Sequence, residues 1–159
     1  MDDSIEVRAA TLADASEVVR LLAQLGHAQP GGDDSARLAA FLDGGEEVFV
    51  AARSPAAEAA PLLGAVTLHV TNVFHRPGPI GRLTAVVVDE SARGRGVGAA
   101  LVRAAEQFLT ARGCALIEVT SNKKRTDAHV FYERLGYTGT SFRFAKTIPI
   151  ADTRGDTAR

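Results

Sequence analysis

Apolar residues recur along the chain at two spacings, and these spacings predict its strands and helices. Apolar and polar residues alternate over 5–8, as in a half-buried strand. Apolar residues then follow at every third or fourth position from Ala15 to Leu25, which predicts a helix that begins near residue 12 and stops at Gly26. The remaining pattern predicts, in order, a helix over 34–42, strands over 46–53, 62–70 and 82–88, a helix over 97–112, a strand over 114–120, a helix over 126–135 and closing strands over 137–148.

This order of elements predicts a mixed α/β (α+β) domain in which one sheet is covered by helices on both faces. Strands and helices do not alternate regularly, so a doubly wound fold is not expected. The 159 residues suit a single domain, 1–159, with a core over about 5–148. Two turns are expected, a loose hairpin tip over 54–60 and a loop over 72–79, and the polar, aperiodic residues 150–159 are expected to be frayed.

Composition narrows the class of protein. The 18 Lys and Arg against 19 Asp and Glu leave a net charge of -1, without the basic excess that nucleic-acid binding needs, so no nucleic-acid partner is expected. No apolar stretch is long enough for a signal peptide or a membrane span, which predicts a cytoplasmic protein without a membrane partner. Cys114 stands alone, so neither a disulfide nor a metal cluster is predicted. Abundant Arg and Ala hint at a bacterial source.

A glycine-rich turn follows an apolar strand and precedes a helix. The strand ends in a continuous apolar run, 86–88, which is typical of a strand enclosed on both faces. The turn, 93–99, holds three alternating glycines and two arginines. Because free N–H groups and the helix dipole meet at such a turn, we predict a phosphate or pyrophosphate ligand there.

Known phosphate-binding patterns match this turn to different degrees. A P-loop is excluded because Gly98 is not followed by Lys and then Ser or Thr. A dinucleotide fingerprint matches formally, with Glu118 about 20 residues further on as the acid that would bind a ribose. Four residues, 89–92, separate that turn from its strand, and only about sixty residues remain for a repeating strand–helix domain. The dinucleotide pattern and a plain flexible turn remain the alternatives.

A third pattern, Arg93-x-x-Gly96-x-Gly98, resembles the acetyl-CoA loop of the GNAT superfamily of N-acetyltransferases. The surroundings resemble that family too, because a long helix, a strand and a helix with Phe131-Tyr132 and then Gly136 follow the loop. The resemblance covers 5–148 and implies the GNAT fold, a mixed, mostly antiparallel sheet of six to seven strands. It also implies acetyl transfer from acetyl-CoA, the co-substrate, to the primary amine of a small molecule by direct attack in a ternary complex.

The resemblance also implies which residues form the site. Backbone groups of the central strand and of the loop would bind the cofactor, together with an Asn at the next strand exit: Val86, Val87, Val88, Arg93, Gly94, Arg95, Gly96, Val97, Gly98, Ala99 and Asn122. Tyr132 aligns with a tyrosine that returns a proton to the leaving thiolate, a general-acid role. Its alternative is a core aromatic residue at helical spacing. Arg125 stands where many members carry an Asn.

The acceptor side departs from the family pattern. The acidic residue usual on the central strand is replaced, and Arg82, His69 and His75 are the candidates for binding the acceptor or its proton. The segments 120–132 and 139–144 resemble aminoalkylphosphonate N-acetyltransferases. Two alternatives remain open, a CoA-binding sensory or scaffold domain without turnover and a protein or peptide N-acetyltransferase. Members often pair as homodimers, so a homodimer is also expected here.

Overall fold

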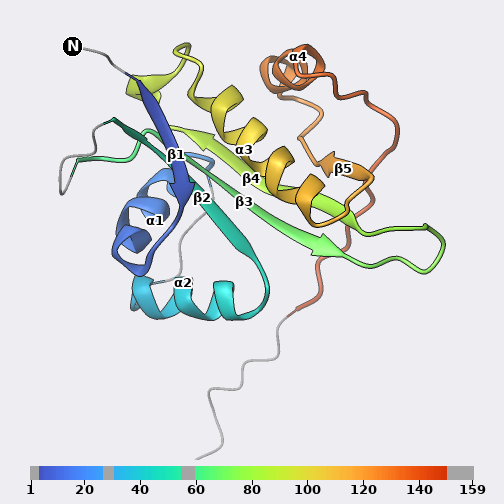
Figure 1. The fold of residues 1–159 in the computed structure, drawn as a ribbon, viewed down its shortest axis with the longest axis horizontal. Helices are drawn as coiled ribbons and strands as arrows, with labels where there is room; N and C mark the ends of the chain where they lie inside the picture. The colour runs from blue at the N-terminus through green and yellow to red at the C-terminus, as the bar shows by residue number, and fades with distance from the viewer. Residues whose placement is uncertain (1–3, 27–30, 55–59, 150–159) are drawn as a thin grey trace, which may run out of the picture.

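The computed structural model describes residues 4–26, 31–54 and 60–149, which form one sheet and its covering helices (Figure 1). The expected frayed tail and most of the expected turn over 54–60 lie outside the described residues. In chain order the elements are β1 (Ile5–Ala9), a 3-10 turn (Leu12–Asp14), α1 (Ala15–Ala23), α2 (Asp34–Asp43), β2 (Glu47–Arg53), β3 (Gly64–Thr71), β4 (Ile80–Val88), a second 3-10 turn (Glu90–Ala92), α3 (Val97–Ala111), β5 (Leu116–Val119) and α4 (Thr126–Arg134).

The strands lie in the order β1-β2-β3-β4-β5. The first three pairs are antiparallel and the last pair, β4 with β5, is parallel. The expected α/β class is therefore confirmed, as a mixed sheet in which antiparallel pairs dominate. No helix within the described ranges is long and apolar enough to cross a membrane.

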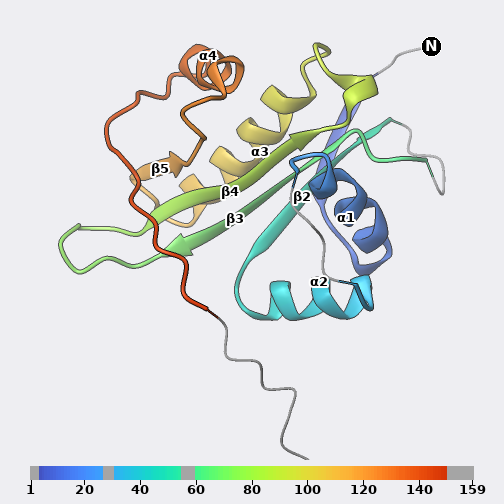
Figure 2. The ribbon, with the colours of Figure 1, turned by 180° about the vertical axis from the view of Figure 1, so that it is seen from behind.

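Helices cover both faces of the sheet (Figures 1 and 2). On one face α3 packs along the sheet and buries Leu101, Ala105 and Leu109 in the larger core cluster. On the other face α1 and α2 bury a second cluster against β2 and β3. Close packing of α3 depends on Gly81, because a Cβ there would lie 2.6 Å from a Leu109 methyl carbon. The missing side chain lets the helix approach the strand closely.

The closing strands expected over 137–148 are absent from the described part of the chain, which contains five strands rather than six to seven. This segment runs without regular structure, and Phe142 and Phe144 are 72% and 93% exposed. Its apolar and polar residues alternate as in a strand, but alternation forms a strand only where a neighbouring edge supplies backbone partners. The adjacent edge strand, β5, is four residues long.

A bidentate ion pair fixes the entry into α1. Both guanidinium Nη atoms of Arg8 donate to the Asp14 carboxylate at 2.8 Å, and the Thr11 N–H donates to the same carboxylate at 2.8 Å. Asp14 is only 8% exposed. The Arg8 guanidinium outweighs the opposing effect of burial and lowers the pKa of Asp14 to about 2.

The depressed pKa of Asp14 predicts a specific acid sensitivity. Its carboxylate stabilises the fold above its unfolded pKa of about 3.9, and this contribution is lost as the pH falls through about 2. Asp14→Asn is expected to lower the free energy of unfolding at pH 7 by about 1–2 kcal/mol, since Arg8 is partly solvated. The variant is also expected to lose less stability than the wild type between about pH 4 and 2. Urea unfolding over a pH series measures both, and parallel pH curves for the two proteins would contradict the prediction.

Candidate functional site

The parallel pair β4 and β5 separates halfway along β4. Their register runs from Ile80 opposite Leu116 to Leu83 opposite Val119, whereas β4 itself continues to Val88. Between Thr84 and Val88 the β5 side of β4 therefore has no strand partner among the described residues. The backbone groups that point to this side, those of Val86 and the N–H of Val88, are open to a ligand, whereas the Val87 carbonyl points at β3 and the Val88 carbonyl accepts from Nε of Arg93 at 3.4 Å. The expected cofactor-binding residues of the central strand lie on this open edge: Val86, Val87 and Val88.

The expectation that this apolar run is enclosed on both faces is confirmed, but the burial of its residues is uneven. Val87 is buried on the face that α1 covers, whereas Val86 and Val88 are half-buried beside α3. The pattern of three valines indicates a central strand, and it does not reveal that the neighbouring strand diverges.

A β-bulge lies where β4 separates from β5. Thr67 pairs with Ala85 and Leu68 with Leu83, so Thr84 is an extra residue in β4. Its hydroxyl lies 2.7 Å from that of Thr67. The bulge shifts the alternation of β4 by one position.

The glycine-rich turn follows this open edge after four intervening residues, 89–92, which include a 3-10 turn. Gly94 and Gly96 have φ values of +75° and +83°, a left-handed conformation that favours glycine. The first hydrogen bond of α3 runs from the Ala100 N–H to the Gly96 carbonyl. The N–H groups of residues 97–99 thus have no acceptor within the helix and form the positive end of its dipole, as an anion site requires. Arg93, Gly94, Arg95, Gly96, Val97, Gly98 and Ala99 are brought together here as expected.

The Phe-Tyr pair of α4 lies against this loop. A Cβ on Gly98 would lie 3.1 Å from Cζ of Phe131 and 3.4 Å from a methyl carbon of Val88. The Phe131 ring therefore packs against the first turn of α3, at the glycine that also faces the end of β4. Tyr132 stacks edge-on against Phe131, with ring centres 5.0 Å apart.

Burial raises the pKa of Tyr132 and outweighs the opposing charge of Arg125. The phenol therefore carries its proton at neutral pH and is able to act as a proton donor. Its neighbour Tyr137 donates to Glu106 at 2.9 Å, and burial together with this bond raises the pKa of Tyr137. Glu106 was not expected from the sequence, because the Tyr137 contact joins residues 31 positions apart.

Asn122 lies in the turn before α4. Its side-chain oxygen accepts the Lys124 N–H at 2.9 Å, and its carbonyl accepts the Arg125 N–H at 2.9 Å. The Asn122 carbonyl also lies 3.0 Å from Nε2 of His129. These bonds give Asn122 a structural part in the turn, and its expected contact with the cofactor stays a prediction.

Charged residues cross the sheet in a row on the face opposite α3. His69 pairs with Arg82 across β3 and β4, and Arg82 pairs with Glu118 across β4 and β5. Nδ1 of His69 lies 3.3 Å from Glu46, and Nε of Arg82 lies 3.0 Å from Glu118, without the alignment of a hydrogen bond. We call these four residues the charged row. Spacing along the chain does not reveal it, because strand register creates it.

His75 does not join the charged row. It lies in the exposed loop over 72–79 that connects β3 and β4, beyond the ends of both strands. Its role in acceptor binding stays a prediction. Within the described residues no group of three or more His, Cys, Asp or Glu is placed to hold a metal ion.

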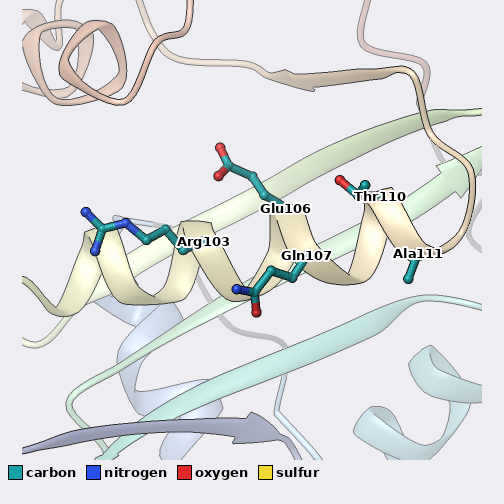
Figure 3. Close-up of a pocket in the computed structure, with 5 residues that line it drawn as sticks. All are labelled: Arg103, Glu106, Gln107, Thr110 and Ala111. Atoms are coloured by element: carbon teal, nitrogen blue, oxygen red, sulfur yellow. The ribbon is translucent and has the colours of Figure 1, made fainter.

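A shallow groove of about 490 Å³ lies elsewhere, on the outer side of α3 (Figure 3). All of its lining residues project from this one helix: Arg103, Glu106, Gln107, Thr110 and Ala111. The lining comes from one helix, and its carboxylate, Glu106, is already bonded to Tyr137, so the groove lacks the convergent polar groups of a binding site. The open edge of β4 and the glycine-rich turn are the better candidate.

Comparison with known proteins agrees with this geometry. The model of the acetyltransferase (GNAT) family matches residues 18–137. Over 87 residues, 55% of this chain and 56% of the relative, the chain is 37% identical to the aminoalkylphosphonate N-acetyltransferase of Salmonella typhimurium. It thus spans little more than half of that relative's length. It is 35% identical to a probable glucosamine 6-phosphate N-acetyltransferase of Oryza sativa over 70% of each chain.

A solved structure shows the same fold. The crystal structure of an acetyltransferase from Trypanosoma brucei superposes with a TM-score of 0.78 at 24% identity, covering 91% of this chain and all of that one. At this identity the likeness establishes the arrangement of strands and helices alone.

Proposed function

Because the chain belongs to the GNAT family of acetyltransferases, we propose that it transfers an acetyl group from acetyl-CoA to the primary amine of a small molecule, with both substrates bound at once. The observation that carries the proposal is the open edge of β4, which leads through a short connection, 89–92, into a turn with free N–H groups at the start of α3. Acetyl-CoA fits this arrangement, because its pantetheine arm carries amide groups along its length and ends in a pyrophosphate.

Binding of acetyl-CoA would use backbone groups more than side chains. The N–H and C=O groups of Val86 and the N–H of Val88, which point away from β3, hydrogen-bond the amides of the pantetheine arm, in place of the strand partner that β4 lacks. The N–H groups of residues 94–99 hold the pyrophosphate, whose charge the helix dipole favours. The positive φ of Gly94 and Gly96 turns the backbone towards it.

Acetyl-CoA supplies a thioester, and the protein orients it and moves protons. The neutral amine nitrogen attacks the thioester carbonyl carbon, so that a C–N bond forms and the C–S bond breaks. Tyr132 donates its phenolic proton to the leaving sulfur. His69, held by Glu46, takes the proton that the amine gives up, directly or through water.

The acceptor is proposed to carry an anion beside its amine. The names of two relatives, an aminoalkylphosphonate and a glucosamine 6-phosphate N-acetyltransferase, each pair an amine with a phosphorus oxyanion. Arg82 in the charged row provides a planar guanidinium suited to such an oxyanion. Glu118 holds that guanidinium in place across the sheet. We further propose that the protein works in the cytoplasm as a homodimer.

Cofactor binding is tested first, by thermal unfolding with acetyl-CoA. The wild type is expected to melt at a higher temperature as acetyl-CoA rises to millimolar concentration, because the ligand binds only the folded state. Gly96→Glu is expected to abolish this shift, since its carboxylate repels the pyrophosphate. Gly113→Glu is the matched control, because Gly113 has a similar φ of +80° at the other end of α3. An unchanged melting temperature of the wild type at millimolar acetyl-CoA would overturn the proposed function.

The proton donor is tested by replacing the phenol. Tyr132→Phe is expected to lower kcat by about 10²- to 10⁴-fold while leaving the Kd of acetyl-CoA nearly unchanged, because only the general acid is lost. Thiol release over a pH series measures the rate. Tyr137→Phe removes a neighbouring phenol as a control and is expected to lower stability without such a loss of rate. If wild-type protein binds acetyl-CoA and releases no thiol with any amine, the chain is a CoA-binding domain without turnover.

The acceptor class is tested with matched pairs of amines. We expect faster acetylation of 2-aminoethylphosphonate and glucosamine 6-phosphate than of ethylamine and glucosamine, which lack the anion. Arg82→Gln is expected to raise KM for the anionic amines about 10- to 100-fold, the value of one charge-assisted contact. KM for acetyl-CoA stays constant. Arg112→Gln, at an exposed pair with Glu47, is the control. Equal KM values for the Arg82 variant and the wild type would contradict this assignment.

A further inference from the structure

The polar side of α1 does not simply face solvent. Glu17, Arg20 and Gln24 follow one another at intervals of three and four residues and therefore lie on one side of the helix. All three side chains reach the backbone or side chain of residues at the start of β3 or the end of β4. The opposite side of α1 is buried in the core. One short helix thus joins the core to the segment that leads into the glycine-rich turn.

Asp89, the first residue after β4, receives hydrogen bonds from two directions. Its Oδ1 accepts from the N–H of Ser91 at 3.0 Å and from the hydroxyl of Ser91 at 2.6 Å. Its Oδ2 accepts from Arg20 at 2.5 Å and from Gln24 at 3.1 Å. One oxygen therefore shapes the turn over 90–92, and the other is held by α1.

The same turn of α1 also holds the chain that enters β3. Glu17 accepts the Leu62 N–H at 3.0 Å, and Arg20 donates to the Leu62 carbonyl at 3.2 Å. The Asp89 N–H donates to the carbonyl of Leu63 at 2.8 Å. Arg20 also pairs with Glu17 at 2.9 Å, so its guanidinium donates to several acceptors and is held in one orientation. The start of β3 and the end of β4 are thereby fixed to one another and to α1.

We propose that Asp89 and Arg20 are positioning residues for the glycine-rich turn, and that α1 through them sets the affinity for the pyrophosphate of acetyl-CoA. This inference rests on the proposed function. Gly96 follows Asp89 by only seven residues, and the buried Ala92 anchors the chain between them. Because this connection is short, the direction of the turn at Asp89 decides where the N–H groups of residues 94–99 point.

The ion pair of Asp89 with Arg20 also sets the charge near the glycine-rich turn. An unpaired carboxylate at Asp89 would lie close to the site of an anionic ligand and repel it. The hydrogen bonds from Ser91 and then the guanidinium of Arg20 hold the pKa of Asp89 far below its usual range, so the carboxylate is ionised and needs a partner at every working pH. Arg20 supplies that partner without occupying the turn itself.

The test measures the Kd of CoA by calorimetry on Asp89→Asn, Arg20→Gln, Arg20→Lys and the double variant Arg20→Gln/Asp89→Asn. Asp89→Asn removes the ion pair with Arg20 and the negative charge together, and its Kd is expected to rise about fivefold. Arg20→Gln leaves the charge unpaired, so its Kd is expected to rise more, about 20-fold. The double variant is expected to match Asp89→Asn, because Arg20 acts on the glycine-rich turn through Asp89. Arg20→Lys keeps one charged bond and is expected to fall between the wild type and Arg20→Gln.

Asp14→Asn is the matched control, since it breaks the other ion pair at the start of α1 away from the glycine-rich turn. It is expected to lower the melting temperature and leave the Kd of CoA unchanged. At saturating acetyl-CoA all Asp89 and Arg20 variants are expected to keep kcat within about threefold while KM for acetyl-CoA rises, which a general loss of stability would not produce.

The outcomes separate the two proposals. If the Asp89 and Arg20 variants lose stability and keep the wild-type Kd, the positioning role is overturned. Additive effects of the two substitutions overturn it too, because they would act independently. If the wild type itself binds no CoA, the proposed function fails instead. Should Asp89→Asn not fold, Arg20→Gln and Arg20→Lys carry the same comparison against Asp14→Asn.

Discussion

The requirement that backbone polar groups find partners governs this molecule at one place, the outer half of β4. Up to Leu83 that strand is paired on both sides, and from Ala85 to Val88 it is paired only with β3 in the described structure. A fold tolerates such an open stretch where water or a ligand satisfies the exposed groups. The bulge, the glycine-rich turn and the Phe-Tyr pair of α4 all lie at this stretch. The candidate site is therefore a consequence of where one pairing stops.

Close approach of α3 to the sheet depends on glycines in the strands. A Cβ on Gly64 would lie 2.9 Å from a methyl carbon of Leu101, and one on Gly81 would lie 2.6 Å from a methyl carbon of Leu109. The helix therefore rests directly on the strands, and its N-terminus comes level with the end of β4. The direction of the free N–H groups follows from this seating and from the short connection after Asp89. The packing of α3 and the geometry of the candidate site are thus set by the same contacts.

Much of this arrangement could be predicted from the chain, because its signals are local. Spacing of apolar residues located the helices and the strands up to β5, and the glycine pattern located the turn before α3. Contacts between distant residues escaped prediction. Arg20 and Asp89 are 69 positions apart, and nothing in either neighbourhood indicates the other. The prediction of closing strands after Tyr137 was wrong. The alternation of apolar and polar residues there is typical of a strand, but the segment has no neighbouring strand to pair with in the described structure.

Because of the bulge at Thr84, the number of residues in β4 decides which face of the sheet each of its side chains occupies. Arg82 and Val87 are five residues apart, so a regular strand would point them to opposite faces. With Thr84 as an extra residue they share a face, and the charged row crosses the sheet opposite α3 while Leu83 and Val86 pack beneath that helix. Deletion of Thr84 would point the Arg82 side chain into the apolar layer beneath α3 and the Leu83 side chain away from it. Evolution can therefore exchange residues in this strand far more freely than it can change their number.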